Sequence, residues 1–170
     1  MIRDSTIEGV CLEKDTAPPS GTFTYAAIQT GHSASGTLLL QDNILTDSQC
    51  RFPIAVFGQN AWIEPFELRV EGGSYESGVN AATAAQNSFY CGAIHAHGDN
   101  REIVIGDDVE FTNPDGLSSI PKACLLYGAK VIVDGAPDPF APGPFSAPVQ
   151  GHLGSEFIDC SLTPTHPDCL

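Results

Sequence analysis

The sequence contains few basic residues and no long apolar run. Its 170 residues include 7 Lys plus Arg against 21 Asp plus Glu, which gives a formal net charge of −14. A surface of that sign repels phosphate backbones and anionic lipid headgroups, so we expect neither nucleic acid nor membrane among its partners. No stretch approaches the roughly 18 consecutive apolar residues of a membrane-spanning helix. The first residues, Met1 to Ser5, lack the hydrophobic region of a signal peptide, which predicts leaderless synthesis in the cytoplasm.

The sequence motifs of several enzyme classes are absent as well. There is no Gly-x-Ser-x-Gly elbow, no glycine-rich phosphate loop and no catalytic-cysteine signature. Carboxylate pairs do occur, at Asp107-Asp108 and at Asp134 with Asp138. A glycosidase would use such a pair as acid and nucleophile. Aspartates in these positions more often form turns by bonding their own backbone, so we predict that the protein is not an enzyme.

The six cysteines are widely spaced, and no two of them form a Cys-x-x-Cys pair. This spacing argues against a zinc ribbon and against a thioredoxin-type redox site. In a reducing cytosol we expect the first four to be buried thiols. These are Cys11, Cys50, Cys91 and Cys124. Cys160 and Cys169 bracket a proline-containing tail and are the predicted disulfide once the protein has left the cell.

The sequence does contain a repeated β-strand pattern. Four segments share an apolar run, a tight polar turn and a second short run. They are residues 38–45, 68–75, 103–111 and 131–136. Their Gly-Gly, Asp-Gly and Asp-Asn pairs supply the positive φ that tight hairpin turns require. The pattern predicts an all-β protein.

Two architectures fit this pattern. If the segments are hairpins, they fold into a β-sandwich or a jelly-roll-like barrel. If the turns, which recur roughly every 30 residues, are corners of successive rungs, the fold is a short parallel β-helix. The spacing is irregular, and stacked rungs usually keep a steadier period. We therefore predict the hairpin-rich sandwich over residues 1–136 and keep the β-helix as the alternative.

Residues 137–170 have a different composition. Five prolines lie close together, at Pro137, Pro139, Pro142, Pro144 and Pro148. Proline at this density blocks helix and removes strand hydrogen-bond donors, so we predict an extended C-terminal arm. Phe140 and Phe145, beside Pro142 and Pro144, would anchor it. We predict that these four residues bind a neighbouring subunit, with the chain's own β-domain as the alternative.

The candidate metal ligands are His95, His97 and Glu102. Alternate residues on a strand point to the same face, so both imidazoles can reach one ion. Four residues separate His97 from Glu102, and with Glu102 the stretch resembles the first metal motif of the cupins, which implies a divalent metal. The glycines do not match that motif, because Gly106 follows too early and Gly92 lies too close. A cupin-like metal protein is one alternative function; otherwise we expect no cofactor.

Trp62 is the candidate residue for carbohydrate binding. It lies in a segment rich in aromatic side chains and proline, residues 51–70. An exposed Trp there would form a sugar-binding platform, whereas a buried one would pack between two sheets. A carbohydrate-binding or β-helical glycan-active protein is therefore a second alternative function.

Taken over its whole length, the chain resembles the decoration, cement and fibre proteins of viral particles, in particular of bacteriophages. The similarity lies in the β-rich core, the acidic surface and the proline-rich arm, and no single motif carries it. It implies a non-enzymatic structural protein that assembles with copies of itself or with other structural subunits. The expected location is a virion or another extracellular assembly.

Overall fold

The computed structural model describes residues 1–9, 26–31, 33–46, 52–58, 64–76, 94–112, 123–133, 150–151 and 154–169. Within these ranges the regular elements are strands, together with one short 3₁₀ turn, η1 (Pro167–Cys169). The same ranges contain no helix that is long and apolar enough to cross a membrane. The predicted all-β character is confirmed.

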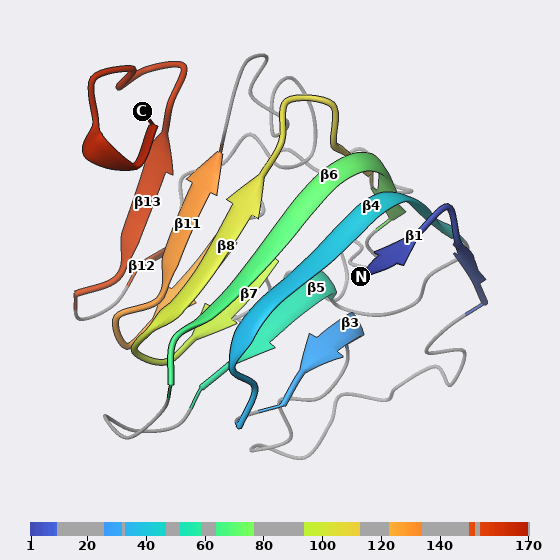
Figure 1. Cartoon of the computed structure of the whole chain (residues 1–170), viewed down its shortest axis with the longest axis horizontal. Helices are drawn as coiled ribbons and strands as arrows, with labels where there is room; N and C mark the ends of the chain where they lie inside the picture. The colour runs from blue at the N-terminus through green and yellow to red at the C-terminus, as the bar shows by residue number, and fades with distance from the viewer. Residues whose placement is uncertain are drawn as a thin grey trace.

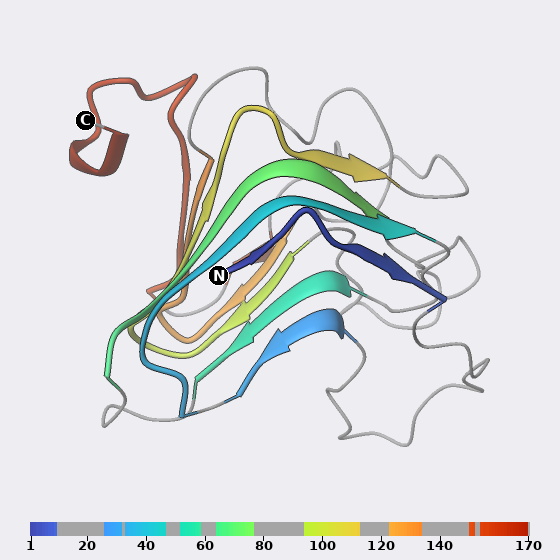
Figure 2. The same cartoon turned by 45° about the vertical axis from the view of Figure 1, so that its right-hand side comes forward.

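The strands form two sheets that lie face to face (Figures 1 and 2). Sheet A contains β1 (Ile2–Arg3), β2 (Thr6–Glu8), β4 (Gly36–Thr46), β6 (Phe66–Glu76), β8 (Arg101–Ile105), β9 (Glu110–Thr112), β11 (Lys130–Val133) and β13 (Glu156–Asp159). Sheet B contains β3 (Ala26–Thr30), β5 (Phe52–Phe57), β7 (Ile94–His97), β10 (Ala123–Leu126) and β12 (Gln150–Gly151).

Every pairing among the described strands is parallel. From β3 to β8 the chain passes alternately from one sheet to the other, and the strand order β1-β4-β6-β8-β11-β13 of sheet A follows the sequence. The colour therefore runs from blue to red across this sheet (Figure 1). The described strands of each sheet therefore stack in parallel, a pairing that agrees with the parallel β-helix, the alternative architecture of the sequence analysis, better than with the sandwich.

The predicted hairpins are wrong. Residues 38–45 lie within the single strand β4, and residues 68–75 lie within β6. In the third segment, β8 and β9 both pair in parallel with β6, so the chain does not reverse between them. Sandwiches and jelly rolls are built from antiparallel strands, and the parallel pairing does not fit them.

The turn-forming residues make stacked corners instead of hairpin turns. Asp42 has a φ of 52° and Gly72 a φ of 64°, and they lie side by side, one residue before the paired Asn43 and Gly73. Both strands bend sharply at this level and then continue in sheet A (Figure 2). The buried Asn43 closes the corner, because its Nδ2 donates to Ile2 O at 3.1 Å and its Oδ1 accepts from Ser5 N at 3.2 Å.

The main core fills the space between the sheets. Side chains alternate in direction along a strand, so every second residue points inward. Sheet A contributes Leu40, Leu45, Leu68, Val70, Tyr75, Ile103, Ile105, Phe111, Val131 and Val133 to this core, and sheet B contributes Ile28, Ile54, Val56, Ile94, Ala96 and Leu125. The residues between them face outward, which places the candidate functional residues on the two outer faces.

Part of the predicted C-terminal arm belongs to the sheets. β12 pairs with β10 and β13 pairs with β11, so residues 150–159 add strands to both sheets. The predicted boundary at residue 136 therefore does not separate these residues from the β-domain. The proline-rich stretch, with Phe140, Pro142, Pro144 and Phe145, lies outside the described residues.

Candidate functional site

A row of charged side chains crosses the outer face of sheet A. Parallel register aligns Glu67 with Glu102, Glu102 with Lys130, and Lys130 with Glu156. These residues alternate with inward-facing ones such as Ile103 and Val131, so they point away from the core. One cation, Lys130, therefore lies among three carboxylates at this level of sheet A.

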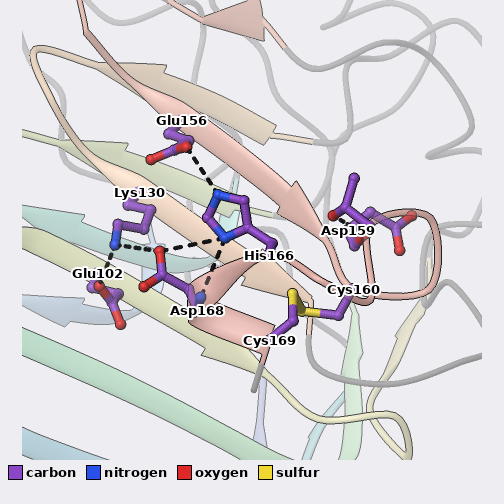
Figure 3. Close-up of polar contacts among 9 residues, drawn as sticks. Glu102, Lys130, Glu156, Asp159, Cys160, His166, Asp168 and Cys169 are labelled. Atoms are coloured by element: carbon purple, nitrogen blue, oxygen red, sulfur yellow. Dashed lines mark hydrogen bonds and ion pairs between the residues drawn. A yellow bond between two sulfur atoms is a disulfide. The ribbon is translucent and has the colours of Figure 1, made fainter.

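Lys130 forms the centre of a cluster that includes the end of the chain (Figure 3). Its Nζ lies 3.2 Å from Glu102 Oε2 and 2.8 Å from Asp168 Oδ2. The hydrogen bond with Asp168 raises the pKa of Lys130, although burial opposes the shift, and Glu102 adds to it. The same bond lowers the pKa of the exposed Asp168. Both groups are therefore charged throughout the neutral range.

His166 adds a second contact between the tail and the sheet. Its Nδ1 accepts a hydrogen bond of 3.2 Å from the backbone N–H of Asp168. The ring proton then lies on Nε2, which faces Glu156 Oε1 at 3.7 Å (Figure 3). We call Glu102, Lys130, Glu156, His166 and Asp168 the strap cluster.

The tail itself, residues 160–169, is closed by a disulfide between Cys160 and Cys169, which confirms the predicted pair. We call this segment the strap. Asp159 turns the chain at the end of β13, because its backbone oxygen accepts from the N–H groups of Leu162 and Thr163 at 3.1 and 2.8 Å. η1 then leads back to the outer face of sheet A (Figure 3).

The chemistry of the strap cluster is that of an anchor. A lysine whose pKa is raised remains an ammonium ion and cannot act as a nucleophile or a general base at neutral pH. The carboxylate with the lowered pKa is ionised and is not a general acid there. In the described part of the chain, no three His, Cys, Asp or Glu side chains are grouped to hold a metal ion.

Comparison of the chain with protein-family models, with curated proteins and with solved structures finds no match.

The structure brings His95 and His97 together but not Glu102. Both histidines face outward from sheet B, because Ile94 and Ala96, which alternate with them along β7, belong to the core. Their ring centroids lie 6.5 Å apart. Glu102 follows the turn at residues 98–100, lies on the outer face of sheet A, and contacts Lys130. The predicted three-residue metal set is not assembled, because the core separates its histidines from its carboxylate.

The two histidines lie in an aromatic environment. The His95 ring is 4.9 Å from that of Phe52 and 5.2 Å from that of Phe57, measured between centroids. Tyr127, half of whose surface is exposed, lies 5.1 Å from the His97 ring. Burial lowers the pKa of His95 to about 4, and the neighbouring His97 acts in the same direction. His95 is thus a neutral, buried ring at pH 7.

Trp62 lies outside the described residues, but the described residues on either side of it contact Arg101. The buried Arg101 donates from Nε to Phe57 O and from Nη1 to Glu64 O, each at 3.0 Å. Its guanidinium carbon also lies 5.7 Å from the centre of the Phe66 ring. Arg101 therefore links a strand of sheet A to both sides of the segment that contains Trp62.

Sequence reasoning did not identify Arg101, Lys130, His166 or Asp168. One signal was available, since Lys130 directly precedes an apolar strand run and Arg101 stands two residues before another, in an otherwise acidic chain. The partners of Lys130 depend on the register of β8, β11 and β13, which the sequence does not display.

Proposed function

We propose that this chain is a non-enzymatic structural subunit of a larger assembly, and that the assembly is a virion, in which it serves as a capsid decoration, cement, or fibre and tail component. The observation that carries the proposal is the strap cluster. Its one cation, Lys130, is bound by Glu102 and Asp168, and the cluster fastens the end of the chain to the outer face of sheet A. Ion pairs that solvent reaches add little to stability, so the cluster's role in the proposal is to position the tail on the sheet.

The parallel stack supports the same proposal. Each described strand of sheet A is aligned with its neighbours over a common core, so the outer faces form a rigid surface with a regular strand spacing. The net charge of −14 makes free molecules of this protein repel one another in solution and favours binding to basic partner surfaces. Contacts with neighbours would come from the proline-rich segment through Phe140 and Phe145.

The test is the native mass of the double variant Phe140→Ser/Phe145→Ser. We do not choose deletion of residues 137–170, because it would also remove β12 and β13 from the two sheets. The proposal predicts that the wild-type protein is an oligomer and that the double variant is a folded monomer. The matched control is Leu162→Ser, which changes a side chain that is 79% exposed in the strap and should leave the mass unchanged.

One observation favours a second candidate, a glycan-active protein. Glu67 and Glu102 are neighbours on the outer face of parallel strands, and both line a groove that also contains Thr37, Asn100 and Lys130. Two carboxylates beside an open groove are the arrangement that glycoside hydrolysis uses. This candidate predicts oligosaccharide cleavage that is lost in both Glu67→Gln and Glu102→Gln. Sugar binding without cleavage, lost in Trp62→Ala, would indicate a binding module instead.

A further inference from the structure

The strap covers an apolar strip on the outer face of sheet A. Val104, Ile132 and Ile158 lie side by side on β8, β11 and β13. Each is less than 10% exposed although it points away from the main core, and together they form a small core of their own. Cys160 and Cys169 pack against this strip. The disulfide is therefore both the covalent lock of the strap and part of the cover.

The noncovalent contacts of the strap are comparatively weak. The Lys130 and Asp168 side chains are 27% and 34% exposed, and the His166 side chain is 31% exposed. Ion pairs that solvent reaches contribute little to stability, because water and salt screen them. Five backbone hydrogen bonds are donated by strap residues: that of Cys160 reaches Val133 O on β11, those of Leu162 and Thr163 reach Asp159 O at the end of β13, and those of His166 and Cys169 are local to the strap. Without the covalent bond, only these contacts and the burial of the small apolar strip oppose the gain in chain entropy on release.

Cys160 and Cys169 are partly exposed residues at the surface of the molecule, and the proposal requires that a small dithiol reaches their sulfurs. We propose that the strap is a redox-sensitive cover, which a dithiol reductant releases from the apolar strip while the two sheets stay folded. A thiolate of the dithiol attacks one sulfur of the Cys160–Cys169 bond and forms a mixed disulfide. Its second thiol then displaces the remaining protein sulfur, so the protein gains two thiols and the reductant is oxidised to a disulfide.

Hydrogen exchange of the backbone amides tests the proposal. In the double variant Cys160→Ser/Cys169→Ser, the hydrogen-bonded amides of residues 162, 163, 166 and 169 should exchange at least tenfold faster than in the oxidised wild type. The strand β8 contains the strip residue Val104, and its backbone amides should remain protected. Fluorescence of a dye that binds apolar surface should rise in the same sample. The control is Asp168→Asn, which removes the ion pair but keeps the disulfide, and should change strap exchange less than threefold.

Graded reduction of the wild-type protein with dithiothreitol gives the second measurement, and it decides the matter if the double variant does not fold. Differential alkylation identifies the concentration at which Cys160 and Cys169 become thiols. At that concentration the proposal predicts fast exchange in the strap and unchanged exchange in β8. Strap exchange that stays within twofold of the oxidised protein after this reduction overturns the proposal, and so does simultaneous acceleration of the strap and β8.

Discussion

His95 is an imidazole that is only 2% exposed, on the outer face of sheet B. Burial opposes its charged form and lowers its pKa from 6.5 to about 4. The unfolded chain therefore takes up a proton at this site before the folded chain does. The resulting stability is fully present above pH 6.5 and is lost as the pH falls toward 4.

We therefore predict that the free energy of unfolding falls by about 2.5 kcal/mol between pH 7.5 and pH 4.5 because of His95 alone. Urea denaturation at a series of pH values measures this loss. His95→Phe keeps an aromatic ring in the site and removes the proton, so its stability should change less over the same range. If the variant and the wild type lose stability equally, burial of His95 does not cause the loss.

Arg101 offers a second single-residue test. Replacement by Met keeps much of the aliphatic volume but leaves the carbonyl oxygens of Phe57 and Glu64 without this donor. Because the site is buried, we expect Arg101→Met to lower the free energy of unfolding by about 3 kcal/mol. Chemical denaturation measures this loss, and Arg69→Met is the control. Arg69 forms only solvent-accessible ion pairs, with nitrogen–oxygen distances of 3.7 and 3.8 Å, so its replacement should lower the free energy of unfolding by less than about 0.5 kcal/mol. Equal effects of the two substitutions would contradict the role given to Arg101.

In β4 and β6, the stacked corners hold the bends of the strands in place. A Cβ at Gly73 would lie 2.1 Å from Asn43 O, and the φ of Gly73 is +91°. Both the clash with the neighbouring backbone and the left-handed conformation oppose any side chain there. We predict that Gly73→Ala lowers the free energy of unfolding by about 3 kcal/mol or more.

The matched control for this corner is Gly31→Ala. A Cβ at Gly31 meets no atom within 4 Å, and its φ lies outside the left-handed range. Thermal and urea unfolding of the two variants should therefore differ clearly. A Gly73→Ala protein as stable as the Gly31→Ala protein would mean that the corner is not built as described.

The sequence located the strands but not their pairing. The apolar runs of residues 38–45 and 68–75 coincide with β4 and β6. Their direction of pairing was predicted wrongly because Asp42 and Gly72 have the positive φ of a hairpin turn and use it for a bend. The irregular spacing of the four segments also favoured the wrong architecture. In stacked parallel strands only the strands must align, and the connections between them can differ in length.

The candidate site was predictable only where the signal is local. Strand alternation placed His95 and His97 on one face, and the short spacing of Cys160 and Cys169 indicated their disulfide. Glu102 was misplaced because the turn after His97 carries the chain from sheet B to sheet A. Lys130 and Asp168 are 38 residues apart in the sequence, and only the folded tail brings them together.

At the scale of the whole molecule, the proposed role is assembly with other subunits. The rigid stack and the fastened tail give a stable body, and the proposed contacts with neighbours lie in the proline-rich segment. The acidic charge of −14 opposes close approach of identical copies, so any self-assembly must be held by apolar contacts and should persist at high salt.

The most direct test is native mass spectrometry of the untagged protein, with metal content measured on the same sample. The account predicts a trimer or larger oligomer that carries no stoichiometric transition metal. A monomer with one such ion per chain would contradict it and would make His95 and His97 the first residues to replace.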